Sequence, residues 1–155
     1  MVFMGSLRRS ALTRMLAWQP ILHRLVLVRS KGQISNVSVI AVYAPTLNAD
    51  DADKVQFYAD LQAAVDAVPS SDVLIVAKDW NARTGPTDDT TRHILGRYGL
   101  GVRCDNGERL VSFADANRLI VTNTRFQHPP CHLVTWQSND GRTANHIDYI
   151  LVRSR

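Results

Sequence analysis

An uninterrupted apolar strand that runs directly into polar residues constrains this sequence most. The segment from Asp72 to Ala77 shows no alternation of polar and apolar side chains, which is typical of a strand covered on both faces. We therefore expect a central strand of a sheet. Lys78, Asp79 and Asn81 follow this strand closely, and the ligand sites of α/β sheets gather where strands end. The sequence predicts a functional site at this end of the strand.

Asp79 and Asn81 lie two positions apart, so their side chains point the same way if the extended conformation continues past the strand. A carboxylate and an amide on one side could hold a hard divalent cation or a water molecule. The alternative is structural: Asp79 caps a turn and Asn81 forms an Asx turn, as these residues often do outside strands. Short motifs of this kind arise by chance, and the local sequence alone favours the structural interpretation.

Two further polar side chains lie in or at the end of expected strands. Asp148 belongs to an apolar strand from His146 to Val152, where alternation places it on the same side as His146. A carboxylate among apolar neighbours requires a partner, which is either a histidine or cation that it orients or an arginine such as Arg142. Tyr43 ends another strand. Its phenol could donate a hydrogen bond to a phosphate oxygen, or it is a plain interface aromatic.

Periodicity and turn residues predict the other elements. The expected strands are Arg24 to Arg29, Val37 to Tyr43, Asp72 to Ala77, Leu119 to Asn123, Leu133 to Gln137 and His146 to Val152. The first two form a hairpin, and a turn at residues 138–141 joins the last two. Amphipathic helices are expected from Asn48 to Val68, capped by Asn48 or Asp50, and from Asn106 to Asn117. The long loop between Asn81 and Asn106 is of a kind that is often functional. The order predicts an α/β domain with helices outside its sheets.

Basic residues dominate the first third of the chain. The formal net charge is +4, and the first acidic residue is Asp50. This excess is compatible with a polyanionic partner. We expect a basic segment of uncertain structure at residues 1–20, weakly similar to a transit peptide, and a domain at residues 21–155. No membrane span is expected, because the best apolar run, Ile21 to Val28, is far shorter than the ~20 residues that a spanning helix needs.

Four motifs, in this order, resemble the endonuclease/exonuclease/phosphatase superfamily. They are Ser38 to Thr46 (SVIAVYAPT), Ile75 to Ala82 (IVAKDWNA), Leu119 to Thr124 (LIVTNT), and Thr135-Trp136 followed by Asn145 to Val152 (NHIDYILV). The sequence looks most similar to the apurinic-type endonuclease domains of non-LTR (LINE-type) retrotransposons and to craniofacial development protein 2-like sequences. Each motif is weak alone, but four in register are hard to obtain by chance.

The resemblance implies a fragment of a four-layered α/β sandwich, in which two packed mixed β-sheets are flanked by helices. It also implies an endonuclease-like domain of a retroelement that hydrolyses DNA phosphodiesters with Mg²⁺ or Mn²⁺. Asp79 would activate the attacking water, Asn81 would orient it, and both would contact the metal. Tyr43 would lie near the leaving oxygen. Asp148 would fix a catalytic histidine and raise its basicity.

The expected partners follow from the same resemblance. Thr46 and Arg83 are expected to contact nucleic acid, with DNA as the partner and a reverse transcriptase domain in the parent element. No small-molecule cofactor or membrane partner is expected. The protein would be intracellular, and nuclear if it acts on genomic DNA.

This sequence also departs from the family pattern. Lys78 stands where the pattern has glycine, which permits unusual dihedral angles, so Lys78 is expected to shift the loop or to pair with Asp79 and lower its basicity. The family's Glu metal ligand would precede Met1, and its Ser-Asp-His motif would follow Arg155, so we expect impaired activity. The alternatives are an inactive nucleic-acid-binding relic and a phosphatase of the same superfamily.

Overall fold

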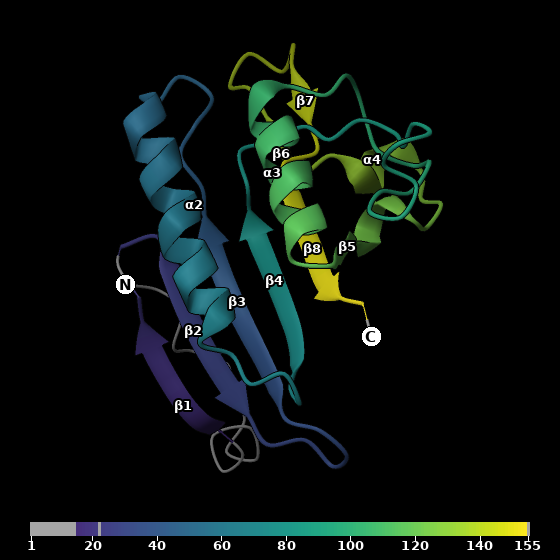
Figure 1. Ribbon diagram of the computed structural model, residues 1–155. Helices are drawn as coiled ribbons and strands as arrows, with labels where there is room; N and C mark the ends of the chain where they lie inside the picture. The colour runs from purple at the N-terminus through teal and green to yellow at the C-terminus, as the bar shows by residue number, and fades with distance from the viewer. Residues whose placement is uncertain (1–14, 22, 155) are drawn as a thin grey trace.

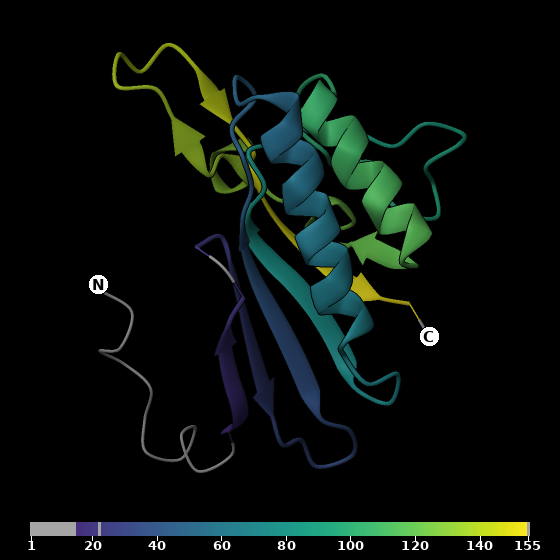
Figure 2. The same cartoon turned by 60° about the vertical axis from the view of Figure 1, so that its left-hand side comes forward.

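The computed structural model describes residues 15–21 and 23–154 of the 155-residue chain. The transit-peptide-like start therefore lies largely outside the described residues. In the described part, two long helices lie against a large sheet (Figures 1 and 2). None of the helices described there is long and apolar enough to cross a membrane.

The large sheet has six strands in the spatial order β1-β2-β3-β4-β8-β5. Their bounds are Met15–Pro20 (β1), Leu25–Ser30 (β2), Val37–Tyr43 (β3), Val73–Asp79 (β4), Asp148–Arg153 (β8) and Leu119–Val121 (β5). The predicted β2–β3 hairpin is confirmed, and β1 adds a strand before the predicted start of the domain at residue 21. β4 lies between β3, its parallel neighbour, and β8, its antiparallel neighbour. The prediction that the apolar run forms a central strand is confirmed.

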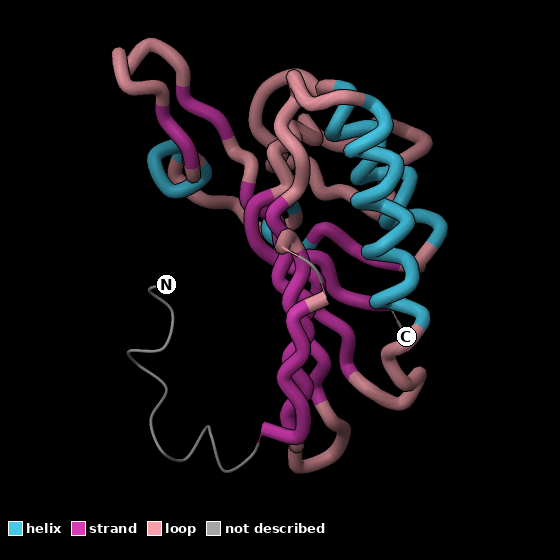
Figure 3. The backbone as a smooth tube through the Cα atoms, turned by 90° about the vertical axis from the view of Figure 1, so that its left-hand side faces the viewer, coloured by secondary structure: helices cyan, strands magenta, loops and turns pink. Residues whose placement is uncertain are grey.

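Two amphipathic helices cover one face of this sheet (Figures 2 and 3). α2 spans Asp51–Asp66 and connects the parallel strands β3 and β4, which cannot be joined by a tight turn. α3 spans Asp105–Ala116 and precedes β5. Asp50 is the N-cap residue of α2, as one of the two predictions had it, although its side chain makes no capping hydrogen bond.

The two faces of the sheet differ in burial. Ile40, Val76 and Leu151 pair in register across β3, β4 and β8 and are fully buried beneath the helices. Their neighbours one position earlier or later in the chain point to the opposite face and are partly buried, except Ile150, which is exposed. The two long helices, α2 and α3, lie on one side of the sheet (Figure 3). The described residues thus form one large sheet with one helix layer, and we call its other side the open face.

The C-terminal strands pair differently from the prediction. β6 (Trp136–Gln137) and β7 (Ala144–Asn145) form a separate two-stranded sheet, and α4 occupies Pro130–Leu133. The predicted strand from Leu133 to Gln137 is therefore mostly wrong, and the turn at residues 138–141 closes this small hairpin. β8 pairs with β4 and β5 instead.

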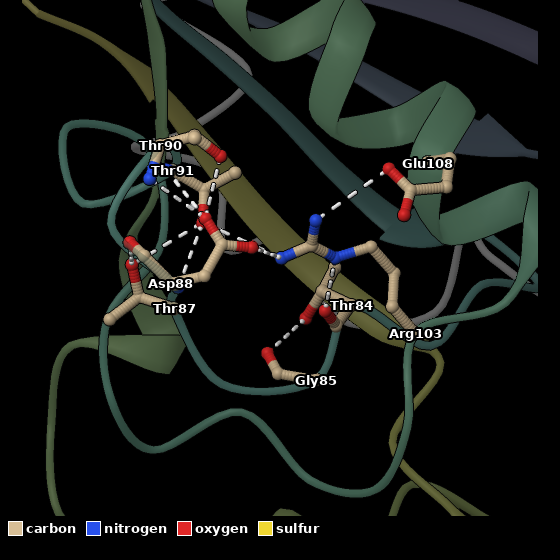
Figure 4. A network of polar contacts seen from close by, with 8 residues as sticks. All are labelled: Thr84, Gly85, Thr87, Asp88, Thr90, Thr91, Arg103 and Glu108. Carbon is tan, nitrogen blue, oxygen red and sulfur yellow. Dashed lines mark hydrogen bonds and ion pairs between the residues drawn. The ribbon is translucent and has the colours of Figure 1, made fainter.

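The predicted long loop between β4 and α3 is confirmed, and a polar network around Asp88 organises it (Figure 4). The Asp88 carboxylate accepts hydrogen bonds from the hydroxyl and backbone N–H groups of Thr90 and Thr91, at 2.7 to 3.0 Å. These bonds hold the pKa of Asp88 well below its usual range. Arg103 pairs with Asp88 and donates to the carbonyl of Thr84, which ties the loop together just before α3.

Backbone strain is concentrated at Lys78 in β4. Its φ is +116°, in a region that L side chains rarely adopt, yet its strand pairing with Val42 and Tyr149 continues. The position thus adopts a backbone conformation that glycine favours. The expected shift of the loop does not occur within the strand, because the register is kept through Asp79.

We expect Lys78→Gly to raise the free energy of unfolding by about 1–3 kcal/mol, because it relieves this strain, less the extra chain entropy of glycine. Lys78→Ala is the control, since it removes the ammonium group but keeps Cβ and the strain. Urea unfolding followed by circular dichroism measures both variants. Equal gains in the two variants would assign the effect to charge and contradict strain relief.

An ion pair between the partly exposed Arg29 and the buried Asp72 lies at the opposite end of the sheet. The Asp72 carboxylate accepts hydrogen bonds from Arg29 at 2.7 and 3.0 Å and from the Ser38 hydroxyl at 2.8 Å. The bond from Arg29 is the main reason that the pKa of Asp72 lies below its usual range. Ionised Asp72 therefore stabilises the fold at pH values above its unfolded pKa of about 3.9.

We expect Asp72→Asn to destabilise the protein at pH 7 and to do so progressively less as the pH falls below about 4, where Asp72 takes up a proton first in the unfolded chain and, at lower pH, in the folded protein. Urea unfolding at several pH values between 7 and 3 measures this difference. The exposed Asp66→Asn variant is the control. A difference that stays constant over the whole pH range would show that ionisation of Asp72 is not the cause.

Candidate active site

The sheet brings three of the predicted site residues into one row. Register pairs Tyr43 with Asp79 across the parallel strands β3 and β4, and Asp79 with Asp148 across the antiparallel strands β4 and β8. Side chains of residues directly opposite each other on neighbouring strands point to the same face. Tyr43 is exposed, and the two aspartates are partly buried. The three side chains therefore line the end of the open face.

The pKa of the Asp79 carboxyl lies above its usual range. Burial is the main cause, and the negative charge of Asp148 adds to it. A hydrogen bond from the Asn81 backbone and the charge of Lys78 act in the opposite direction. Lys78 thus lowers the basicity of Asp79, as one expectation had it, but burial outweighs this effect. Two carboxylates placed side by side favour the uptake of a proton or a cation.

Asn81 does not continue the strand. Its φ is +45°, and its backbone N–H donates to Asp79 Oδ1 at 2.9 Å, so that Asp79 closes an Asx turn. The extended conformation, on which a shared direction of the Asp79 and Asn81 side chains depended, therefore does not continue past the strand. The chain turns because Trp80 is fully buried, with its indole N–H donating to the carbonyl of Tyr149. The structural interpretation of the Asp79 side chain is confirmed, and it leaves the carboxylate in the row.

The Asn81 side chain reaches the segment that follows β3. Its Nδ2 donates to the carbonyl of Ala44 at 2.8 Å. The backbone N–H of Ala44 donates to the carbonyl of Asp79 at 2.9 Å. Asn81 therefore links the ends of the two parallel strands that carry Tyr43 and Asp79.

Asp148 is held through its backbone. The Thr135 hydroxyl accepts hydrogen bonds from the N–H groups of Ile147 and Asp148, at 3.1 and 3.2 Å. The Asn123 amide donates to the carbonyl of Asp148 at 3.0 Å and accepts from the N–H of Ile150 at 3.2 Å. Asn123 thereby continues the pairing of β5 with β8 after β5 has ended. Sequence reasoning assigned neither residue a role, although both lie in the four motifs.

Arg142 was the alternative partner expected for Asp148. Its guanidinium lies 3.8 Å from a carboxylate oxygen of Asp140, on the small hairpin. The alternative prediction of an ion pair between Arg142 and Asp148 is therefore wrong. Arg142 lies in the turn between β6 and β7, where Asp140 is its acidic neighbour.

His146, which the sequence places within the expected last strand, is buried. It precedes β8 and is 2% exposed. Its ring packs against Tyr149 with 4.5 Å between ring centroids, and its Nε2 lies 2.8 Å from the Asn123 amide nitrogen. Burial lowers the pKa of His146, and contacts with Asp148 act in the opposite direction. A neutral ring with Nε2 as acceptor fits this setting.

The predicted nucleic-acid-binding residues lie on the segments that leave the row. Thr46 is exposed on the loop after β3, and Arg83 is partly buried on the loop after β4. Sequence reasoning did not assign a site role to Arg24, whose guanidinium lies 5.7 Å above the Tyr43 ring and donates to the Tyr43 carbonyl at 3.4 Å. The one sequence feature that pointed to a role for Arg24 was its place among the basic residues of the first third of the chain.

Two curated proteins are similar to this chain in sequence. Over 132 residues the chain is 45% identical to craniofacial development protein 2 of Bos taurus and 42% identical to that of Tragulus javanicus. The aligned segment covers 85% of this chain but only 22% and 23% of those proteins. No family model matches the sequence.

Solved structures show the likeness in fold. The endonuclease domain of TRAS1, a telomere-specific non-LTR retrotransposon, superposes with a TM-score of 0.56 at 14% identity, over 83% of this chain and 48% of that domain. D. rerio TDP2, complexed with a single-strand DNA product, gives 0.57 at 11% identity over 91% and 53%. An endonuclease/exonuclease/phosphatase family protein from Leptotrichia buccalis C-1013-b gives 0.52 at 13% identity over 84% and 41%.

This chain spans about half of these solved chains and less than a quarter of the curated relatives. At such low identity the solved structures speak for the fold alone, whereas the curated relatives share the sequence itself. The chain has the α/β fold of endonuclease/exonuclease/phosphatase proteins and is similar in sequence to a segment of craniofacial development protein 2.

Proposed function

We propose that this chain carries a site for metal-dependent cleavage of phosphodiester bonds in DNA. The row of Tyr43, Asp79 and Asp148 on adjacent strands carries this proposal. It places a phenol and two carboxylates at one end of a sheet, in a domain whose fold is that of hydrolases. Two of the similar structures are an endonuclease domain and a protein complexed with a DNA product, which supports nucleic acid as the substrate.

The acidic pair fits a hard divalent cation such as Mg²⁺ or Mn²⁺. Mg²⁺ is commonly bound by one or two carboxylates together with water and substrate phosphates. Burial is the main reason that the pKa of Asp79 is raised, and the negative charge of Asp148 adds to it, so a cation between the two carboxylates would relieve their repulsion. Within residues 15–21 and 23–154, no group of three or more His, Cys, Asp or Glu side chains is placed to hold a metal. We therefore assign the metal to Asp79 and Asp148, with substrate and water as its other ligands.

Asn81 has a narrower role in this proposal. One hydrogen of its Nδ2 is used in the bond to Ala44, and its Oδ1 could bind a metal ion or accept a hydrogen bond from a water molecule. We propose that Asn81 orients the attacking water and holds the end of β3 in place. This role combines the expected chemistry with the observed contact.

The three residues of the row have different roles in the proposed cleavage. In this proposal Asp79 is the group that takes the proton of the attacking water. Tyr43 donates a hydrogen bond to the leaving oxygen from its exposed position. Asp148 orients the cation or a histidine. A cation held by Asp79 and Asp148 would stabilise the negative charge that develops on the phosphate.

Contacts with DNA are proposed for Thr46 and Arg83, and Arg24 adds a guanidinium beside Tyr43. Basic side chains that face phosphates gain affinity by releasing counterions. Cleavage of genomic DNA would place the protein in the nucleus. The resemblance to retrotransposon endonucleases extends the proposal to a parent element that also encodes a reverse transcriptase domain.

A second candidate is a nucleic-acid-binding domain without catalysis. Two observations favour it: Lys78 places a cation and a strained backbone next to Asp79, and the described residues include no third acidic or histidine ligand beside the acidic pair. This candidate predicts salt-sensitive DNA binding without cleavage.

The test compares Asp79→Asn and Asp148→Asn with the wild type. We expect the wild type to bind Mn²⁺, measured as loss of free Mn²⁺ in an electron paramagnetic resonance titration, and to nick supercoiled plasmid in Mg²⁺. Asp79→Asn should lower the nicking rate by about 100-fold or more, as loss of a general base does. Asp140→Asn is the matched control, because it removes an exposed carboxylate from the small hairpin.

Circular dichroism of each variant separates loss of function from loss of fold. A folded wild type that binds DNA in a salt-sensitive manner but neither binds Mn²⁺ nor nicks plasmid would replace the catalytic proposal with the binding one. Equal nicking rates in the wild type and in Asp79→Asn would also contradict it.

A further inference from the structure

We propose that Asn106, in the first turn of α3, is a positioning residue that sets the distance between the ends of β3 and β4. This inference rests on the proposed function, because these strand ends carry Tyr43 and Asp79. Asn106 is 4% exposed and lies on a different element from every residue of the row. It therefore acts on the site through the backbone that leaves the two strands.

The Asn106 amide binds both of the segments that directly follow β3 and β4, which we call the strand exits. Its Nδ2 donates to the carbonyl of Pro45 at 3.0 Å and to the carbonyl of Asn81 at 2.9 Å. Pro45 lies two residues after Tyr43, and Asn81 lies two residues after Asp79. One NH₂ group thus uses both of its hydrogens to hold the segments that follow the tyrosine and the aspartate.

These two bonds complete a ring of contacts around the strand ends. Ala44 donates to the carbonyl of Asp79 at 2.9 Å, and the Asn81 side chain donates to the carbonyl of Ala44 at 2.8 Å. Both contacts join β3 directly to β4. Asn106 adds a third connection from the helix layer, so that movement of one exit relative to the other breaks bonds to the same amide.

The orientation of the Asn106 amide follows from its partners. Both neighbours of Nδ2 are carbonyl oxygens, so a flipped amide would place oxygen against oxygen. This orientation leaves Oδ1 buried without a hydrogen-bond partner among the described residues. A buried acceptor without a partner destabilises a fold. An apolar residue would avoid that loss, so the presence of an amide here indicates that the two donated bonds are needed.

The neighbouring residue shows how closely α3 approaches the β4 exit. A Cβ atom added to Gly107 would lie 2.0 Å from the carbonyl oxygen of Arg83. The first turn of α3 is therefore packed directly on the loop that follows Asn81. Because backbone cannot yield as a flexible side chain can, this contact fixes the place from which Asn106 reaches Pro45 and Asn81.

The test uses backbone amide hydrogen exchange, measured by nuclear magnetic resonance, on the whole chain without metal. We expect Asn106→Ala to accelerate exchange at the N–H groups of Ala44 and Asn81 by about 10-fold, because the local opening no longer breaks the bonds to the amide. The N–H of Trp80, which bonds to the carbonyl of Ile147 on the β8 side, should change far less. Asn106→Ser, which keeps one donor, should give an intermediate result.

Asn117→Ala is the matched control. Asn117 lies at the other end of α3 and also donates twice, to Gln62 Oε1 at 2.8 Å and to the carbonyl of Phe113 at 3.0 Å. Its loss removes a comparable set of bonds far along the helix from the row. We expect it to leave exchange at Ala44 and Asn81 unchanged relative to the rest of the sheet.

A second arm measures Mn²⁺ affinity by the same titration as above. Asn106→Ala should weaken it by about 10-fold, as changes in residues that orient metal ligands do, whereas Asn117→Ala should not. Acceleration spread evenly over all sheet amides, or an unchanged Mn²⁺ affinity, would overturn the positioning role. If the wild type binds no Mn²⁺, the proposed function fails, and the exchange arm alone supports or overturns the link between the strand exits.

Discussion

The parallel pairing of β3 with β4, continued by the antiparallel pairing of β4 with β8, is the constraint on which the site depends. It places Tyr43, Asp79 and Asp148 opposite one another although they are far apart in the sequence. A shift of one residue in either pairing would turn one side chain to the other face of the sheet. The buried partners Ile40, Val76 and Leu151, which face the helices, hold this register because the same shift would expose them.

The chemistry of the row depends on where the sheet ends. The apolar residues of β4 are followed by Trp80, which is buried and turns the chain. Asp79 therefore stays in the last position of the strand, where burial and Asp148 raise its pKa and where its side chain also closes the turn. A carboxylate that is held in place by hydrogen bonds and has a shifted pKa is a common feature of catalytic sites. The residue before Asp79, Lys78, has a strained backbone with a positive φ.

The layers of the fold explain why amides are so prominent near the site. Strand ends carry carbonyl groups that no neighbouring strand pairs, and buried carbonyl groups need donors. Asn81, Asn106 and Asn123 supply them from the β4 exit, α3 and the turn after β5. Each joins elements distant in sequence. The three amides thus connect the segments that carry the row to the helix layer and to the loops.

Local patterns in the sequence determined much of the fold. The unbroken apolar run predicted a central strand, three- and four-residue spacings predicted both long helices, and the hairpin of β2 and β3 followed from its strands and turn. The four motifs predicted the fold class and named every residue of the row. These features depend on neighbours within a few positions, so periodicity and turn chemistry are sufficient to find them.

Tertiary structure decided the rest, because strand pairing and side-chain contacts join residues that no local pattern connects. Only the fold set β8 beside β4 instead of in the small hairpin, buried His146, and gave Arg142 a different acidic neighbour. The positive φ of Lys78 and Asn81 likewise appears only in the folded structure. The sequence by itself determined which residues could form the site, and the packing of distant strands and of α3 determined how they meet.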